Sequence, residues 1–259
     1  MPPSSIPGVA ELIVVRHGES TANIAFAAAR ASGALDLGLT CRDAAVPLSP
    51  LGCWQAARLG VRLMESPTDE RPEVVLCSPY VRARQTLGIA SAVVAACGPA
   101  LPPPRFDDRL RDRVMGELEL LSDAAIGARF PAETRRRRTV GEFHYRPPGG
   151  ESFDDVTARL REVLDDLHVR HPGRRILLVA HDAVVLMLRR LIEGLSWQEV
   201  ADIVRDGPVA NASLTRWRHA NGALRLVAYN QVDHLHSPKK REERTREARD
   251  LANSRSLPL

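Results

Sequence analysis

A short apolar run near the start of the chain ends in residues that can bind and attack a phosphate. After Leu12-Ile13-Val14-Val15 the sequence continues as Arg16-His17-Gly18-Glu19, and Asn23 follows four residues beyond the acid. Arginine offers a planar fork that matches phosphate oxygens, and histidine offers a nitrogen nucleophile. We interpret Gly18 as the residue that lets the backbone approach an anion closely. This corner therefore predicts a phosphate site.

Two later apolar runs also end in polar, chemically useful residues. Residues 73–77 lead into Ser78, and residues 175–180 lead into His181. Runs of this kind are typical of buried strands, and the carboxyl ends of such strands meet at one edge of an open α/β sheet, where ligands bind. We therefore expect His181 to lie beside Arg16 and His17.

Arg82 is predicted to bring a second guanidinium to the same edge. It lies four residues after Ser78 and four before Thr86, so it shares a helix face with Thr86. Two arginines and two histidines can pair the three equatorial oxygens of a phosphoryl group without a metal ion. The sequence contains no Walker A loop, HExxH motif or zinc-ligand spacing, and we expect no metal and no cofactor. His17 is the predicted nucleophile.

The elements that must position these side chains alternate between strand and helix. Apolar spacings predict helices over 49–65, 153–167, 183–193 and 196–205, and Ser78-Pro79 is typical of the cap and first position of another. Residues 214–218 and 224–229 flank Asn221-Gly222, which favours a tight hairpin. Residues 105–110 are predicted as a short strand. The alternation predicts an α/β fold built on βαβ units.

The length and composition favour one large globular domain. The chain has 259 residues, of which 44% are apolar and 26% are charged. We predict a domain over 1–237 with an insertion at about 113–148, followed by a charged tail over 238–259 that is a frayed helix or disordered. We see no signal segment, no long apolar stretch and no CxxC pair, and we expect a cytoplasmic protein with reduced thiols and no membrane contact.

The charge pattern favours small anions as partners. The formal net charge is +4, and arginine greatly outnumbers lysine, so the basic surplus lies on forked side chains that match phosphate. We expect a small phosphorylated substrate rather than nucleic acid. The run Arg135-Arg136-Arg137-Arg138 is interpreted as a solvated face, with a rim for a polyanionic substrate or nucleic-acid contact as the alternatives. Trp197 and the apolar helix ends near it are candidates for a homodimer contact.

Several motifs in order resemble those of the histidine phosphatase superfamily, in its first, phosphoglycerate-mutase-like branch. The RHGE motif of that family matches Arg16-His17-Gly18-Glu19, and the other elements span roughly 12–235: Pro47 to Ala56, Ser78 to Thr86, Leu110-Arg111-Asp112, Gly149 to Ser152, and Val179-Ala180-His181. The resemblance implies a three-layer α/β/α sandwich with a mostly parallel central sheet, and a phosphohistidine intermediate on His17. It also implies a phosphate pocket completed by Arg16, Arg82 and His181, with further substrate-binding candidates at Asn23, Glu19 and Asp182.

Two aspartates compete for the role of general acid. Asp112 stands where the first branch of the family carries a glutamate. The pKa of Asp112 must rise before it can deliver a proton near neutrality, and a bound phosphate dianion would raise it. Asp182 follows the second histidine, as in the acid-phosphatase branch, where that aspartate donates the proton. We favour Asp112, with Glu117 and Glu119 as stand-ins.

The predicted function is hydrolysis of phosphomonoesters. The mutases of the family carry Asn-Glu-Arg-His-Tyr-Gly where this chain has Arg111-Asp112-Arg113-Val114-Met115-Gly116, so hydrolysis is favoured over mutase phosphotransfer. A non-catalytic nucleic-acid-binding module is the third hypothesis, and the intact set of pocket residues argues against it. Glu151 is interpreted as a support of the site or a substrate contact, whereas Ser152, with Asp155 three residues on, predicts a helix cap.

Overall fold

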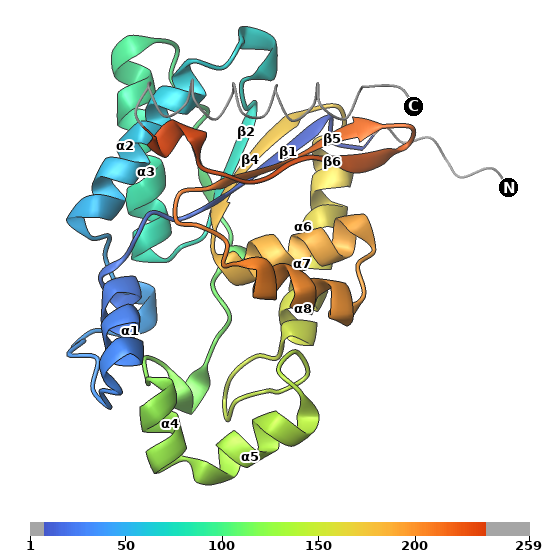
Figure 1. Cartoon of the computed structure of the whole chain (residues 1–259). Helices are drawn as coiled ribbons and strands as arrows, with labels where there is room; N and C mark the ends of the chain where they lie inside the picture. Colours follow the sequence, from blue (N-terminus) through green and yellow to red (C-terminus); the bar gives the residue numbers. More distant parts are fainter. Residues whose placement is uncertain (1–7, 237–259) are drawn as a thin grey trace, which may run out of the picture.

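A computed structural model describes residues 8–236 of the chain. A six-stranded sheet runs through its centre in the order β3-β2-β4-β1-β5-β6 (Figure 1). The strands are β1 Glu11–Arg16, β2 Val74–Cys77, β3 Arg105–Phe106, β4 Arg175–Ala180, β5 Leu214–Ala220 and β6 Ala223–Gln231. The first four are mutually parallel, and β5 and β6 are antiparallel to their neighbours. The mostly parallel sheet predicted from the sequence is confirmed.

The two central strands are buried because both of their faces are covered. Every residue of β1 is buried, and so are five of the six residues of β4. Successive side chains of a strand point to opposite faces. Accordingly, Ile13 and Val15 pack in one core cluster, whereas Leu12 and Val14 pack in the other. The continuous apolar runs seen in the sequence are therefore those of a strand with helices on both sides.

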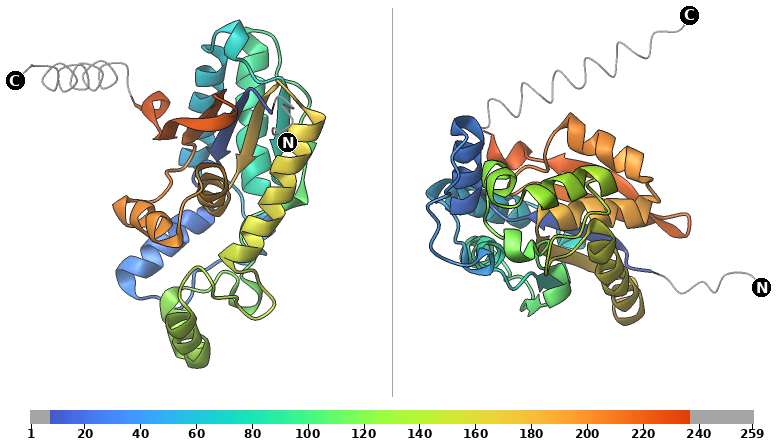
Figure 2. Two further views of the ribbon diagram at one scale, coloured as in Figure 1. Left: turned by 90° about the vertical axis from the view of Figure 1, so that its right-hand side faces the viewer. Right: turned by 90° about the horizontal axis from the view of Figure 1, so that it is seen from below.

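Helices cover both faces of the sheet and give the molecule three layers (Figures 1 and 2). α2 (Pro50–Met64) and α3 (Val81–Cys97) supply the core of one face, and α6 (Phe153–Arg170) and α7 (Asp182–Glu193) supply that of the other. α1 (Thr21–Ser32) lies beyond the carboxyl end of β1, and α8 (Trp197–Asp206) follows α7. The α/β/α sandwich is confirmed.

Three local predictions need correction. Ser78-Pro79 does not open a helix, because α3 begins at Val81 with Tyr80 at its N-cap. The strand predicted over 105–110 covers only Arg105–Phe106 and is followed by a turn of 3-10 helix, Asp108–Leu110. α1 was not predicted, since its alanine-rich sequence carries a weak apolar periodicity. The hairpin at Asn221-Gly222 is confirmed, with φ of 52° and 81° at the two residues.

The segment predicted as an insertion holds two short helices, α4 (Asp123–Arg129) and α5 (Pro131–Val140). It has a small core of its own, formed by Leu118, Ile126 and Tyr145. No residue of α5 is buried, and two arginines of the predicted solvated run form ion pairs within the segment, Arg136 with Glu133 and Arg137 with Glu142. Those two charges are thus neutralised locally. The division of the chain into a domain and a tail stays a prediction, because residues 237–259 lie outside the described residues.

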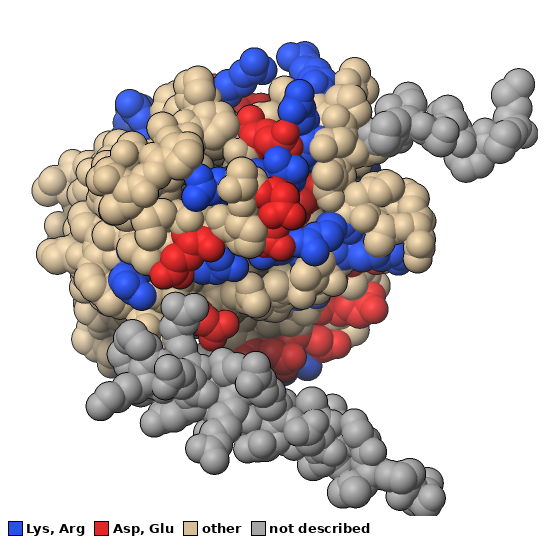
Figure 3. All heavy atoms as spheres, turned by 90° about the horizontal axis from the view of Figure 1, so that it is seen from above, with Lys and Arg blue, Asp and Glu red and all other residues tan. Residues whose placement is uncertain are grey.

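Acidic and basic side chains are interspersed on the face shown in Figure 3. Several of the ion pairs involve β5 and the start of β4. Glu11, buried at the start of β1, accepts from Arg216, which also reaches Glu70, and Glu73 pairs with Arg174 and Arg175. The small positive surplus of the chain therefore forms no single-sign patch on that face.

Candidate active site

The ends of two neighbouring strands bring the two histidines together. β1 and β4 run parallel with Arg16 opposite Ala180, and the backbone N–H of His17 donates to the carbonyl of Ala180 at 2.9 Å. His17 and His181 are the next residues along each strand, and their ring centroids lie 5.2 Å apart. Both rings are buried. The structure thus places them side by side, as the sheet-edge argument predicts.

The hydrogen bonds of His17 define which of its ring nitrogens is free to react. Nδ1 lies 2.7 Å from the carbonyl oxygen of Gly18. A carbonyl only accepts, so Nδ1 carries the proton and Nε2 carries the lone pair. Nε2 accepts from Nε of Arg82 at 3.2 Å. Burial, followed by the neighbouring His181, Arg82 and Arg16, lowers the pKa of His17 well below its usual value. His17 is therefore neutral at physiological pH.

Arg82 is the most heavily bonded side chain of the site. Besides Nε, which donates to His17, Nη1 donates to the backbone oxygen and Oδ1 of Asp43 at 2.7 and 2.9 Å. Nη2 donates to Oδ2 of Asp43 at 3.2 Å and to Oδ2 of Asp112 at 2.9 Å. A guanidinium has five N–H donors, so each one has a partner. Thr86, one turn on, holds the corner by accepting from the N–H of Gly18 and donating to the carbonyl of Arg82.

Asp112 joins Arg82 to the second histidine. Its Oδ2 lies 3.3 Å from Nδ1 of His181, whose Nε2 is 2.8 Å from the hydroxyl of Ser78. Burial acts to raise the pKa of Asp112, but His181, ahead of Arg82 and His17, holds it well below its usual range. Burial lowers the pKa of His181, against the opposing effect of Asp112. Beside these neighbours Asp112 is a carboxylate.

One buried side-chain nitrogen of Arg16 has no protein partner. Its Nη1 donates to the carbonyl of Val209, and its Nη2 lies 3.6 Å from Oδ2 of Asp182, whereas its buried Nε has no partner. Asp182 is the first residue of α7, and its Oδ1 accepts from the N–H of Ala183. Its side chain is 44% exposed, about twice the 21% of Asp112. Asp112 therefore lies deeper in the site.

Comparison with known proteins agrees with this geometry. A family profile of the histidine phosphatase superfamily (branch 1) matches residues 12–232. The chain belongs to that superfamily. A metal-independent phosphoserine phosphatase of Arabidopsis thaliana is 26% identical over 229 residues, which are 88% of this chain and 84% of that protein. A 2,3-bisphosphoglycerate-dependent phosphoglycerate mutase of Gloeobacter violaceus is 29% identical over 202 residues, covering 75% and 81%.

Solved structures of the superfamily share the fold. The structure of mycobacterial glucosyl-3-phosphoglycerate phosphatase in complex with VO3 matches with a TM-score of 0.63 and 26% identity, and the match covers 86% of this chain and all of that one. The recognition of the family from its ordered motifs is thus confirmed. Two of these three relatives are named as phosphatases, which supports assignment of this chain to the phosphoric monoester hydrolases.

Two residues of the RHGE region face structural partners rather than the pocket. Oδ1 of Asn23 accepts from the N–H of Ser20 and from Nδ2 of Asn211, so it caps α1. Glu19 accepts from the hydroxyl of Ser49 at 2.7 Å. Both side chains therefore stabilise the corner, and their predicted roles as substrate-binding residues stay predictions.

Gly18 is required by the packing of the corner against α2. A Cβ at Gly18 would lie 2.5 Å from the carbonyl oxygen of Gly52 in α2, and a Cβ at Gly52 would lie 1.9 Å from that of Glu19. Two backbone segments thus cross in contact, and no side chain fits between them. The interpretation that Gly18 lets the backbone approach an anion stays a prediction, and the structure adds a packing requirement set by Gly52, a partner distant in the sequence.

Glu151 supports the segment that carries Asp112. It accepts from Arg111, from Arg159 and from the N–H of Val114. Arg159 in turn donates to the carbonyl of Asp112 at 3.2 Å. Ser152 caps α6, as predicted. Glu151 therefore acts as a support, the first of its two predicted roles.

Two residues near the pocket were not predicted. Asp43 binds Arg82, as described above, and Tyr80 packs edge-on against His181 with ring centroids 5.2 Å apart. Tyr80 lies within the Ser78–Thr86 motif and could have been found there. Asp43 lies in a connection without periodicity, so only the fold brings it to the site.

Three groups of the pocket have the spacing of metal ligands. Ligand-type atoms of His17, Asp112 and His181 lie within 4.8 Å of one another, and this group alone in residues 8–236 does so. Arg82 donates to two of these residues. A divalent cation would therefore meet a guanidinium at close range, which makes the group a poor metal site and a good anion site.

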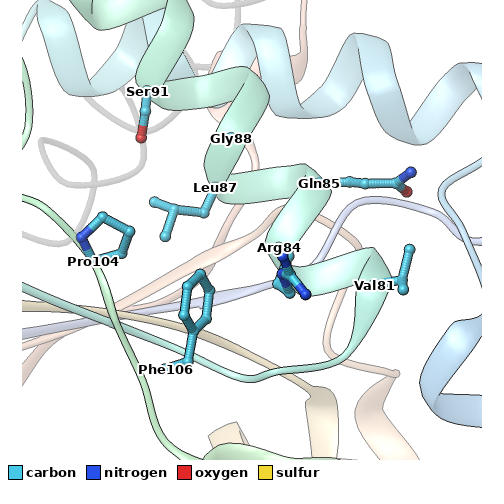
Figure 4. A pocket seen from close by; sticks show the side chains of 8 residues that line it. All are labelled: Val81, Arg84, Gln85, Leu87, Gly88, Ser91, Pro104 and Phe106. Carbon is cyan, nitrogen blue, oxygen red and sulfur yellow. The ribbon is translucent and has the colours of Figure 1, made fainter.

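A separate hollow lies away from His17, Arg82, Asp112 and His181. A mainly apolar hollow of about 550 Å³ lies between α3 and β3, lined by residues such as Arg84, Leu87 and Phe106 (Figure 4), and none of the pocket residues lines it. Within residues 8–236, no helix combines the length and apolar character needed to span a membrane. Trp197 stacks on Phe143 within the chain, with Arg190 over its ring.

Proposed function

We propose that the protein hydrolyses phosphomonoesters through a phosphohistidine on His17, without a metal ion. The observation that carries the proposal is the lone pair on Nε2 of a neutral, buried His17, held beside the guanidinium of Arg82. Nε2 attacks phosphorus, the P–O bond to the substrate breaks, and the leaving alkoxide takes a proton. Water then attacks the phosphohistidine, the P–N bond breaks, and phosphate and neutral His17 are released.

The two arginines supply the charge that the phosphoryl group needs. The unpartnered Nε of Arg16 is a preformed donor, and the bonds from Arg82 to His17 and Asp112 can be exchanged for bonds to phosphate oxygens. His181 adds a donor when its Nδ1 is protonated. Donors of this kind stabilise phosphoryl transfer because they are already in place when charge shifts onto the oxygens.

Asp112 is the general acid that we favour over Asp182. It lies in the buried cluster of Arg82 and His181, whereas Asp182 is half-exposed and bonded to the start of α7. When a phosphate dianion takes over Arg82, Asp112 loses the hydrogen bond from that guanidinium and gains an anionic neighbour. Both changes raise its pKa toward the range that an acid catalyst needs.

Leaving-group chemistry separates the two aspartates. An alkyl phosphate needs protonation of its leaving oxygen, whereas para-nitrophenyl phosphate does not. We expect Asp112→Asn to lower kcat on an alkyl phosphate by about 100- to 10,000-fold and to affect the aryl ester much less. Asp182→Asn should treat both esters alike. The reverse pattern would make Asp182 the acid.

The central experiment measures phosphate release from a panel of small phosphorylated metabolites, with His17→Ala as the blank. Quenching in base and mass spectrometry should locate a phosphoryl group on His17 in the native chain, and activity should survive EDTA. A His17→Ala variant with native activity would refute the mechanism. Loss of activity in EDTA that added metal restores would refute metal independence. The names of the relatives place phosphoserine and glucosyl-3-phosphoglycerate in the panel.

Mutase phosphotransfer is the second candidate, favoured by the mutase relative. The residues from Arg111 to Gly116 differ from the acid motif of the mutases, which argues for hydrolysis. Incubation with 3-phosphoglycerate distinguishes the two, since isomerisation without free phosphate would identify a mutase.

A cytoplasmic location and a homodimer remain part of the proposal. The third candidate, a nucleic-acid-binding module, would show binding that weakens steeply with salt.

A further inference from the structure

Asp43 binds the phosphate-facing arginine from behind. It lies in a single turn of 3-10 helix, Asp43–Ala45, in the connection between α1 and α2. Its carboxylate accepts from both terminal nitrogens of Arg82, at 2.9 and 3.2 Å, and its backbone oxygen accepts a third bond at 2.7 Å. The side chains are 21% and 4% exposed, so the pair is largely shielded from water.

The two edges of the guanidinium serve different partners. Asp43 occupies the end formed by Nη1 and Nη2. The side formed by Nε and the other N–H of Nη2 faces His17 and Asp112. A phosphate can therefore bind that side while the bonds to Asp43 stay in place, since a guanidinium presents its donors in a rigid fork.

Asp43 is itself held by the segment 113–148. Its backbone N–H donates to Oε1 of Glu119 at 2.8 Å. A second bond, from the hydroxyl of Ser122 to the carbonyl of Ala34 at 2.8 Å, ties the same two segments together. Glu119 thus has a defined partner, whereas Glu117, two residues earlier, is exposed.

We propose that Asp43 is a positioning residue for phosphoryl transfer, which orients the side edge of Arg82 toward the phosphoryl group, and that Glu119 fixes Asp43. This inference rests on the proposed function. Arginine has a long, flexible side chain, and two parallel bonds at its far end remove the freedom that would otherwise be lost at each turnover. Asp43 touches no reacting atom and acts only through Arg82.

The test uses matched substitutions. In Asp43→Asn, an amide NH2 replaces the carboxylate oxygen that accepts from Nη2 of Arg82, so one of the two parallel hydrogen bonds is lost. In Glu119→Gln, the acceptor for the N–H of Asp43 loses its charge. A 1 Å misplacement of a catalytic group lowers the rate about 100-fold. We therefore expect Asp43→Asn, which loosens Arg82, to lower kcat on para-nitrophenyl phosphate about tenfold or more. Glu119→Gln should have a smaller effect. The control Asp36→Asn, an exposed residue in the same connection, should stay within about twofold.

Repeating the substitutions in an Arg82→Ala background separates a positioning role from a structural role. If Asp43 acts only through Arg82, Asp43→Asn should change neither kcat nor phosphate binding further once Arg82→Ala is present. Likewise, Glu119→Gln should add nothing to Asp43→Asn, because coupled residues are not additive. An equal loss in the wild-type and Arg82→Ala backgrounds, or native kcat in Asp43→Asn, would overturn the inference.

A phosphate-binding measurement tests the role of Asp43 independently of whether the protein is a hydrolase. Inorganic phosphate should raise the melting temperature of the wild-type chain, and this rise should be smaller in Asp43→Asn but not in Asp36→Asn. An inactive wild-type chain would refute the hydrolase proposal, and the phosphate shift would still report on Asp43. A phosphate shift in Asp43→Asn that equals the wild-type shift would refute the positioning role, whatever the activity.

Discussion

Alanine at position 52 is expected to disturb the catalytic corner although the residue lies in a helix. Gly52 is the third residue of α2, and its φ is not positive, so the backbone itself accepts alanine. The new Cβ, however, would lie 1.9 Å from the carbonyl oxygen of Glu19 and 2.9 Å from its nitrogen. Both contacts are with backbone, which cannot rotate away.

The size of the effect follows from that distance. An ordinary contact of 3.4 Å requires the corner and α2 to separate by about 1.5 Å at this point. Overpacking of a tight site costs about 1–3 kcal/mol of unfolding free energy. Because Glu19 is two residues from His17, a displacement of this size should also lower kcat by about 100-fold.

Gly88→Ala is the matched control. Gly88 lies inside α3, and nothing lies within 4 Å of the Cβ that alanine would add. This variant should gain about 0.8–1 kcal/mol from helix propensity and keep native kcat. Urea unfolding and phosphate release from para-nitrophenyl phosphate measure both quantities. If Gly52→Ala is as active and as stable as the wild-type chain, the contact between the corner and α2 does not position His17.

Three further predictions concern titration and buried charge. Because burial and cationic neighbours lower the pKa of His17, kcat/KM on para-nitrophenyl phosphate should not fall between pH 8 and 6.5, and an acid limb with a midpoint above pH 6.5 would contradict this. Burial lowers the pKa of His234 from 6.5 to about 4, so the unfolded chain binds a proton that the folded chain does not. The unfolding free energy should therefore fall by about 3 kcal/mol as the pH drops from 6.5 to 4, and His234→Gln should remove this part of the slope in urea titrations. Arg159→Met should cost about 1.5–3 kcal/mol, since it removes one of the two arginines bonded to the partly buried Glu151 and the donors to the carbonyls of Arg109 and Asp112. Arg161→Met, exposed on the same helix, should change unfolding by less than about 0.5 kcal/mol.

The strand ends of the site were predictable because their signal is local. A continuous apolar run that stops at His17 or His181 indicates both that the strand is buried and where the strand ends at the edge of the sheet. The cap at Ser152 and the hairpin at Asn221-Gly222 are equally local, and both are present. Chemistry attached to such boundaries can be located from the sequence.

Contacts between distant segments were not predictable in this way. The need for glycine at position 18 comes from Gly52, and the partner of Arg82 at position 43 comes from a connection with no periodic pattern. The ionised state of Asp112 depends on His181, which lies 69 residues along the chain. Each of these properties exists only after the sheet has brought separate segments together.

The bond between Glu119 and Asp43 bears on how such a protein can diversify. Apart from Asp112, the groups proposed to handle phosphorus belong to strand ends and to the start of α3. The segment 113–148 follows directly on Asp112, and two bonds tie it to the connection between α1 and α2, one between Glu119 and Asp43 and one between Ser122 and Ala34. Helix α5 buries none of its residues. Mutation can therefore exchange or lengthen the outer part of this segment without removing side chains from the core around the sheet.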